Sequence, residues 1–320
     1  MSARSWNKIE GVVAAAVVEV LWRQSRAIGA AASGKAAERS IVDPEALILA
    51  SLCYRESEPR LWTVIADWLR EGSRLLSVQR LRNLRSAFPG LSAEGLSELA
   101  RAAIAQAGDA RWKPLVSRQP GRVAPKRKSG PAAPRIRSAG PVLDTGPALL
   151  LRLRAAFGVG LKADLVGFLM SNQVSTTVAS AAKALGYSVP PIFRSLQDLV
   201  AAGIARTVAR PAAMEYAIDS GPWEKVLGRL FPPFWRPWKE TFAYALALRQ
   251  AVIQWEDRTV SEYAAAVRLR ELGEGWSESI VRAGLYVEDL RDRVKAPDSA
   301  DLSAWSDFNV KLAGEIGSWV

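Results

Sequence analysis

Histidine is absent from this chain of 320 residues, and Cys53 is its only cysteine. These absences exclude Ser-His-Asp and Cys-His catalysis, histidine-ligated metals, zinc ribbons and internal disulfides. An enzyme of this composition would have to work through carboxylates, lysine, tyrosine or serine. The composition therefore favours a binding or regulatory role over a catalytic one, and we predict no cofactor and no metal. A single thiol is also typical of a reducing cytoplasm.

Long apolar segments are lacking as well. The run from Gly11 to Val18 is bounded by Glu10 and Glu19, and it is far shorter than the ~20 residues that cross a bilayer. A secretory signal needs an uninterrupted apolar core after its positive start, and Glu10 interrupts it here. We therefore expect an N-terminal helix over 10–28, no membrane association and a cytoplasmic protein.

Positive charge is abundant, but it is confined to one stretch of the chain. The formal net charge is +11, from 43 basic and 32 acidic residues, and residues 111–140 alone contain nine basic and no acidic side chains. This stretch is rich in Pro, Gly, Ala and Ser and poor in large apolar residues, which is typical of a flexible linker. It separates an N-terminal domain (1–110) from two further predicted domains, at 141–220 and 221–320.

Residues 1–110 predict helices throughout. Asp43 is placed to cap a helix with Pro44 at its first position, and Ser77 is placed to cap another. In that second helix we expect Arg80 to point outward, while Leu81 and Leu84 point to the core. The predicted fold class is mainly α, with a helical N-terminal domain, a central domain with a small β-ribbon and a helical C-terminal domain.

Tryptophan is concentrated in the last hundred residues, 221–320, which hold seven of the twelve tryptophans. A long helix is predicted over 239–255, after the proline pairs that precede it. The aromatic side chains fit either a core and domain interface or a surface for an effector or partner. We expect this helical domain to dimerise or to sense a ligand.

Residues 147–218 show a specific order of elements. Gly186-Tyr187-Ser188 predicts a tight turn between helices, and Arg210-Pro211-Ala212-Ala213 predicts a turn between two short strands. The predicted helices cover Pro147–Phe157, Leu161–Ser171, Thr176–Leu185, and a stretch from Pro190 or Pro191 to about Ala202. Three helices and a turn, followed by a helix and a two-stranded ribbon, are the layout of a winged helix-turn-helix.

The segment from Val178 to Ile204 resembles bacterial winged-helix regulators of the ArsR and MarR kind. A helix of small residues and a Leu-Gly turn precede the next helix, and Leu-x-x-Leu-x-x-x-Gly-hydrophobic leads into the wing. Together with the layout of residues 147–218, the resemblance covers about 75 of the 320 residues. It implies a DNA-binding repressor, and a homodimer on a symmetric operator is then expected. Helical extensions around such a domain are similar to those of abortive-infection antitoxins.

Helical geometry sorts the side chains of the predicted recognition helix. Ile192, Leu196, Leu199 and Val200 share one face, which must meet the core, and Arg194 points away, where it can reach guanine O6 and N7. Threonines at a helix start can hold a phosphate, and arginines in the wing can reach the backbone. The predicted DNA-binding residues are Thr176, Thr177, Ser188, Pro190, Pro191, Arg194, Ser195, Gln197, Arg206 and Arg210, with Lys126, Arg127 and Lys128 of the linker.

An alternative function stays open, because winged helices also bind proteins. Residues 141–220 hold seven basic and five acidic residues, and Asp164 and Asp198 reduce the basic character of this domain. On this interpretation the protein is an adaptor or antitoxin whose partner is another protein.

The Gly29–Lys35 segment resembles a phosphate-binding loop, but Ala36 stands where that motif needs Ser or Thr.

The basic linker leads to a first testable prediction. Replacing Lys126, Arg127 and Lys128 with Ala should weaken binding to all DNA sequences alike. The slope of log affinity against log salt should flatten by about 0.9 for each phosphate that the variant no longer neutralises. Titrations at several salt concentrations measure both effects, and a weakening restricted to one specific DNA sequence would contradict the linker's role as a phosphate-binding tether.

Overall fold

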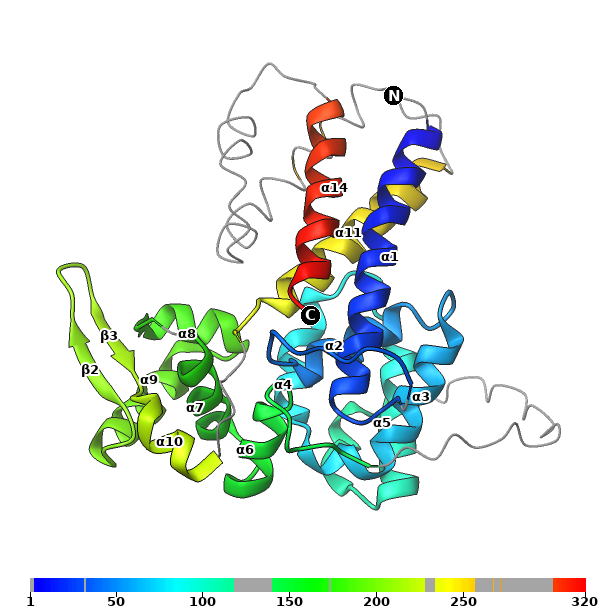
Figure 1. The fold of residues 1–320 in the computed structure, drawn as a ribbon. Helices are drawn as coiled ribbons and strands as arrows, with labels where there is room; N and C mark the ends of the chain where they lie inside the picture. The colour runs from blue at the N-terminus through cyan, green and yellow to red at the C-terminus, as the bar shows by residue number, and fades with distance from the viewer. Residues whose placement is uncertain are drawn as a thin grey trace.

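Helices make up most of the chain, and a small antiparallel sheet of three strands accompanies them (Figure 1), which confirms the mainly helical fold class. The computed structural model describes residues 3–31, 33–117, 140–172, 174–227, 234–256, 267, 271 and 302–320. Lys126, Arg127 and Lys128 of the predicted linker lie outside the described residues. Among the described helices, none is both long and apolar enough to cross a membrane.

The N-terminal helices pack around one central helix, α2 (Pro44–Cys53), of which nine of ten residues are buried. Asp43 caps α2 by accepting a hydrogen bond from the N–H of Ala46 at 3.1 Å, and Pro44 occupies the first turn, as predicted. The surrounding elements are α1 (Ala3–Ala27), α3 (Pro59–Gly72), η1 (Ser73–Leu75), α4 (Val78–Leu84), η2 (Arg85–Ala87), α5 (Ala93–Ala107) and η3 (Ala110–Leu115).

The segment that was predicted to open the linker is folded. In η3, Trp112 is fully buried and Leu115 is buried as well. The Arg111 guanidinium donates hydrogen bonds to the carbonyl oxygen of Ser73 at 3.1 Å and to the carboxylate of Asp109 at 2.6 Å. The N-terminal helical unit therefore extends to Leu115, beyond the predicted boundary at residue 110, because Trp112 completes its core.

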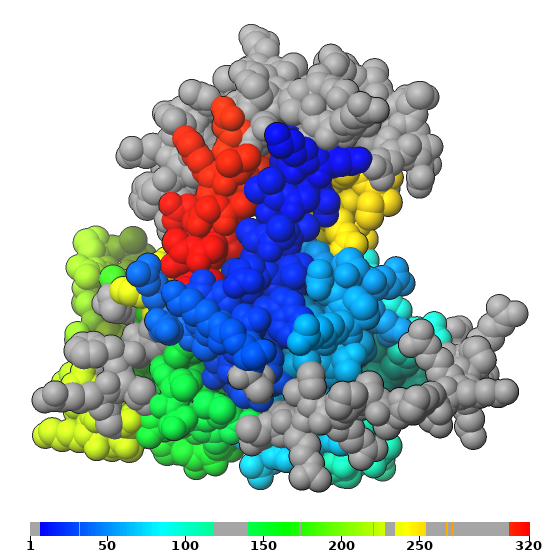
Figure 2. All heavy atoms as spheres, turned by 45° about the vertical axis from the view of Figure 1, so that its right-hand side comes forward, coloured from blue at the N-terminus to red at the C-terminus, as the bar shows by residue number. Residues whose placement is uncertain are grey.

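Two C-terminal helices, α11 (Trp238–Glu256) and α14 (Leu302–Ser318), belong to the same core as the N-terminal helices. Both pack against α1, and Figures 1 and 2 show α14 and α1 side by side. The buried Trp238 stacks on Phe242 at 5.5 Å between ring centroids and donates its indole N–H to the carbonyl oxygen of Ile41 at 2.9 Å. For Trp238 and the equally buried Trp319, the core interpretation of the aromatic residues is confirmed.

A second hydrophobic core lies between residues 149 and 227 and includes Ile41. The elements of this part of the chain are α6 (Leu149–Phe157), α7 (Leu161–Ser171), α8 (Val178–Leu185), α9 (Val189–Ala201), α10 (Ser220–Leu227) and the strands β1 (Thr176–Thr177), β2 (Arg206–Ala209) and β3 (Met214–Ala217). The apolar face predicted for α9 is confirmed, because Ile192, Leu196 and Leu199 are buried in this core.

The sheet has the strand order β1-β3-β2, with both pairings antiparallel. Strands β2 and β3 are the predicted pair, and their register runs from Arg206 opposite Ala217 to Ala209 opposite Met214. Strand β1 differs from the prediction, which places Thr176 and Thr177 at a helix start. Their β-branched side chains suit a strand, and α8 begins immediately after them.

Candidate functional site

The outer face of α9 is open to solvent along the length of the helix. Arg194 and Gln197 are exposed there, Ser188 and Pro190 are exposed at its N-terminal end, and Pro191 and Ser195 are partly buried. The Gln197 side chain donates a hydrogen bond to the hydroxyl of Tyr216 in β3 at 3.1 Å. This contact ties the helix to the sheet. The predicted recognition face thus lies on the surface, and Gln197 within it also binds Tyr216.

The wing carries the other predicted cations. Arg206 and Arg210 are both exposed, at the start of β2 and in the β2–β3 turn. The Arg210 guanidinium lies 3.5 Å from the carboxylate of Glu215 across the hairpin. In Figure 1 the β2–β3 hairpin projects away from the helical body. The two arginines therefore lie on a projecting element that can contact a macromolecule.

The two predicted phosphate-binding threonines are placed differently from the expectation. Thr176 is buried in β1 opposite Tyr216, so little of its side chain is open to solvent. Thr177 is the N-cap of α8, where its hydroxyl accepts from the N–H of Ser180 at 3.2 Å. This is a correction to the assignment of both residues to the first turn of a helix. The capping hydroxyl of Thr177 already occupies one of the backbone N–H groups that a phosphate at this helix end would use.

Below this surface lies a feature that sequence reasoning missed, a group of five buried charges that we name the charge cluster. Arg154 of α6 is at its centre and is fully buried. Its guanidinium donates to both oxygens of Glu45 at 2.7 and 3.0 Å, to both oxygens of Asp164 at 2.7 and 3.0 Å, and to the carbonyl oxygen of Leu75 at 3.1 Å. All five guanidinium N–H groups of Arg154 are therefore used.

Arg80 of α4 is the second cation of the charge cluster, and it corrects the prediction that this side chain points outward. It is fully buried, and it donates to both oxygens of Asp43 at 2.5 and 2.6 Å and to Glu45 at 2.7 Å. Its Nε donates to the carbonyl oxygen of Leu185 at 2.7 Å. The charge cluster thus consists of Asp43, Glu45, Arg80, Arg154 and Asp164.

The charge cluster joins the two hydrophobic cores. Asp43, Glu45 and Arg80 come from the N-terminal helices, whereas Arg154 and Asp164 come from α6 and α7 of the second core. Asp164 is therefore buried, and it does not lower the charge of an exposed surface as the sequence suggested. Only Asp198 remains on the surface of α9, where it pairs with Lys162 at 2.8 Å.

Electrostatic coupling keeps these groups ionised in spite of their burial. Burial alone would raise the pKa of the Glu45 carboxyl, but Arg154 and Arg80 lower it from 4.5 to about 2. Burial alone would lower the pKa of Arg80 and Arg154, but the carboxylates around them raise both values. Burial, assisted by the Asp164 carboxylate, raises the pKa of Tyr187. Tyr187 therefore keeps its proton and donates a hydrogen bond to Asp164 at 3.0 Å.

The turn between α8 and α9 is held directly against α4. Arg80 binds the carbonyl oxygen of Leu185, and the Asn83 amide donates to the carbonyl oxygen of Gly186 at 3.1 Å. Gly186 has a φ of +71°, and a Cβ added there would lie 2.4 Å from a methyl carbon of Leu84. The turn therefore needs glycine for two reasons, its left-handed backbone and its close contact with α4. The start of α9 is fixed relative to the N-terminal helices.

The signal that could have revealed the charge cluster is charge inside apolar helices. Glu45 precedes a run of apolar residues in α2, Arg154 lies among the leucines of α6, and Asp164 lies in α7, which is buried from residue 163 to 171. Taken alone, each of these charged residues in the sequence predicts a helix cap or an exposed side chain. Their mutual pairing, across as many as 109 residues of sequence, becomes visible only in three dimensions.

Other reactive or metal-binding arrangements are not found in the described part of the chain. No cluster of three or more acidic, histidine or cysteine side chains there could hold a metal ion. Burial raises the pKa of the Cys53 thiol to about 12, although Arg249 opposes the effect. A thiol with this pKa is protonated at neutral pH and is a poor nucleophile.

The candidate functional site is therefore the exposed surface of α9 and the wing. The charge cluster fixes the turn at the start of α9.

Replacing Arg154 with Met should destabilise the protein by about 3–5 kcal/mol, because the change leaves Asp164 and Glu45 buried beside a single remaining cation. Chemical denaturation followed by circular dichroism measures the loss. Arg101→Met on the exposed surface of α5 is the control, and its free energy of unfolding should change by less than about 0.5 kcal/mol. Equal small effects of the two substitutions would show that the charge cluster contributes little.

The lowered pKa of Glu45 predicts a specific acid dependence. The stability that this carboxylate contributes is fully present above its ordinary pKa of 4.5 and is lost as the pH falls through the folded-state value of about 2. The free energy of unfolding should therefore fall between about pH 4.5 and pH 2. The same titration of Glu45→Gln should have a shallower slope over this range, and two parallel curves would contradict the assignment.

No protein-family model, curated protein or solved structure matches this chain. The functional argument therefore depends on the chain's own residues and on their arrangement.

Proposed function

We infer that this protein is a cytoplasmic DNA-binding transcriptional regulator of the repressor or antitoxin-like kind, and that α6–β3 forms a winged helix-turn-helix. The observation that carries the inference is the element order α7-β1-α8-α9-β2-β3 with strand order β1-β3-β2. In this layout α8 and α9 form the helix-turn-helix, and β2 and β3 form the wing. The exposed face of α9 and the projecting hairpin support it.

The dimensions and chemistry of α9 suit a major groove. Its 13 residues correspond to a helix of about 20 Å, and the groove is about 12 Å wide. Arg194, in the N-terminal half of α9, would donate two hydrogen bonds to a guanine. Arg206 and Arg210 of the wing would contact the phosphate backbone, which orients the protein without reading sequence.

The charge cluster supports a rigid recognition element. Arg80 and Asn83 hold the carbonyl oxygens of the α8–α9 turn, and Tyr187 is bound to Asp164. A helix whose N-terminal end is fixed in this way loses little conformational freedom when it binds. On this proposal, the N-terminal and C-terminal helices act as one body with the DNA-reading unit.

A homodimer is part of the proposal. Two recognition helices of a dimer read half-sites separated by about 34 Å, one turn of B-DNA. Each of α1, α11 and α14 carries an exposed apolar side chain, at Val12, Ile253 and Val310 respectively. Burial of such side chains between two copies would favour association. The layer formed by α1, α11 and α14 is therefore the proposed dimer surface.

A second candidate function is favoured by the apolar side chains beside Arg194. Val189 is 50% exposed and Phe193 is 47% exposed on α9, and exposed aromatic residues often anchor protein interfaces. Asp198 further lowers the positive charge of this helix. On this alternative, α9 docks on a partner protein, such as a toxin, and the protein is an adaptor.

Fluorescence-anisotropy titration with DNA from upstream of the protein's own gene separates the two functions. Arg194→Ala should cost about 1–3 kcal/mol of binding free energy and relax specificity at one base pair. Arg206→Ala should weaken binding to all sequences alike and reduce the salt slope by about 1. Arg101→Ala, on α5, is the control and should bind as the wild type does.

Two outcomes would reject DNA reading by α9. One is no binding of any DNA at low salt, and the other is wild-type affinity of the Arg194→Ala, Arg206→Ala double variant. A Phe193→Ala substitution that abolishes capture of a protein partner, while DNA binding stays absent, would instead support the adaptor.

A further inference from the structure

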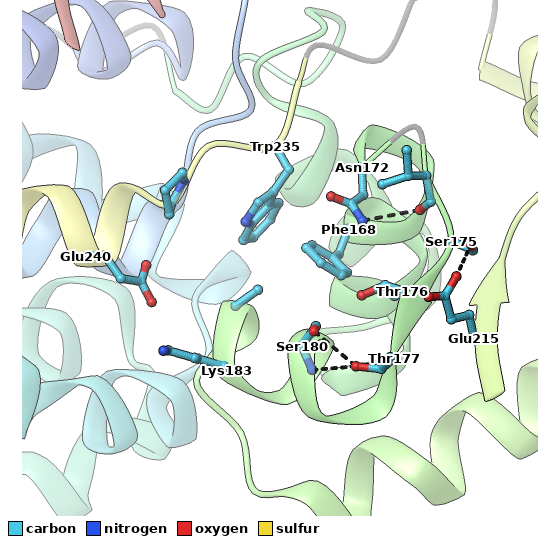
Figure 3. A pocket seen from close by; sticks show the side chains of 13 residues that line it. Phe168, Asn172, Ser175, Thr176, Thr177, Ser180, Lys183, Glu215, Trp235 and Glu240 are labelled. Atoms are coloured by element: carbon cyan, nitrogen blue, oxygen red, sulfur yellow. Dashed lines mark hydrogen bonds between the residues drawn. The ribbon is translucent and has the colours of Figure 1, made fainter. Parts of the chain in front are cut away.

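A cavity of about 320 Å³ lies between the winged-helix unit and the segment that leads into α11 (Figure 3). One wall comes from β1, α8 and β3, with Thr177, Ser180 and Glu215. The opposite wall comes from Trp235 and Glu240. The cavity therefore joins the DNA-reading unit to a helix of the other core.

Glu240 is the side chain that points to a ligand. It is only 9% exposed, and Figure 3 shows its carboxylate directed into the cavity. Its Oε1 pairs with Nζ of Lys239 at 2.7 Å, and the same Nζ donates to the carbonyl oxygen of Lys183 at 2.7 Å. Its Oε2 is buried and has no hydrogen-bond partner. Leaving a buried carboxylate oxygen without a hydrogen-bond donor costs free energy. A ligand that supplies a donor to Oε2 would remove this cost.

The rest of the cavity defines the chemistry of that ligand. Phe168 and Trp235 meet edge to face with their ring centroids 5.0 Å apart, and they form an aromatic corner. The charged side chains of the lining are Glu215, Glu240 and Lys183, and the ammonium group of Lys239 already pairs with Oε1 of Glu240. Oε2 of Glu240 is the carboxylate oxygen that is left without a donor. A ligand whose ammonium group donates to Oε2 of Glu240 would complete the hydrogen bonding of this carboxylate, and an aromatic body would pack on the two rings.

We propose that this cavity binds a small aromatic amine, whose ammonium group donates to Oε2 of Glu240 and whose ring packs against Trp235 and Phe168. The cavity volume is at the lower end of the range for small-molecule sites, which limits the ligand to about the size of a bicyclic amine. Carboxylic acids of the same shape are excluded, because an ionised carboxylate has no hydrogen-bond donor for Oε2 of Glu240 and would be repelled by it.

Binding at this place would also regulate the winged helix, and this consequence alone depends on the proposed function. Thr177 and Ser180 line the cavity and form the capping contact of α8. A ligand that bridges them to Glu240 would fix α8, and with it α9, relative to α11. The amine would thus act as an effector of DNA binding.

Isothermal titration calorimetry of the full chain with tryptamine tests the site. Indole-3-propionic acid, which has the same ring and spacer with a carboxylate in place of the amine, is the matched ligand control. Tryptamine should bind and the acid should not. Glu240→Gln should weaken tryptamine binding at least tenfold, because it removes a charge-assisted hydrogen bond. The matched control Glu38→Gln, at an exposed position, should bind as the wild type does.

Ala184→Phe provides an independent test that keeps the carboxylate. Ala184 lines the cavity from α8, so a larger side chain should fill the space and abolish binding, while thermal denaturation verifies that both variants fold. The proposal is overturned if millimolar tryptamine gives no binding, if the acid binds equally well, or if neither Glu240→Gln nor Ala184→Phe weakens binding.

A second measurement separates the site from its regulatory effect. Saturating tryptamine should change DNA affinity at least threefold in the wild type and leave the Ala184→Phe variant unchanged. Tryptamine binding without any change in DNA affinity would reject the regulation and retain the site. Tryptamine binding by a protein that binds no DNA would reject the proposed function and retain the site.

Discussion

Buried ion pairing among Asp43, Glu45, Arg80, Arg154 and Asp164 is the constraint on which the rest of the structure depends. Each of these side chains is shielded from water, and each charged group is bound to groups of the opposite sign. Removing so many charges from water is expensive, and their attraction offsets that cost only in a geometry where every donor and acceptor is matched. Such a network tolerates few alternative arrangements. It therefore links the N-terminal helices to α6 and α7 at the place where the two hydrophobic cores meet.

This constraint gives the N-terminal helices a role in the proposed function, although they lie outside the winged-helix layout. They supply the groups that hold the α8–α9 turn, because Arg80 and Asn83 bind its carbonyl oxygens and Leu84 packs on Gly186. The orientation of α9 therefore depends on α4. Beside the cavity, Lys239 of α11 donates to the carbonyl oxygen of Lys183, which adds a second connection, from α8 to α11. If α9 is a recognition helix, as proposed, its position between two such connections suits it to regulation by anything that alters either of them.

Local signals in the sequence predicted much of the secondary structure. The caps at Asp43 and Ser77, the buried face of α9, the turn at Gly186 and the β2–β3 hairpin each depend on neighbouring residues, so each is present in the structure as predicted. The errors arose where a distant residue decided the outcome. Thr176 and Thr177 form a strand because β3 is there to pair with them. Arg80 is buried because Asp43 and Glu45 lie opposite it.

The sequence by itself determined the chemical limits of this protein, namely no histidine chemistry, one thiol and a basic segment at 111–140. It also determined most of the order of helices and strands in residues 147–218. Composition and short-range periodicity need no tertiary information. The sequence also determined the exposed side chains of α9, since helical geometry follows from spacing. Only the tertiary structure decided that five charges from separate helices meet in one buried cluster, that the C-terminal helices share the N-terminal core, and that Glu240 faces a cavity against the second core. These contacts join residues far apart in the chain, and their free energy comes from complementary charge and desolvation at a single place in space, which no local pattern records.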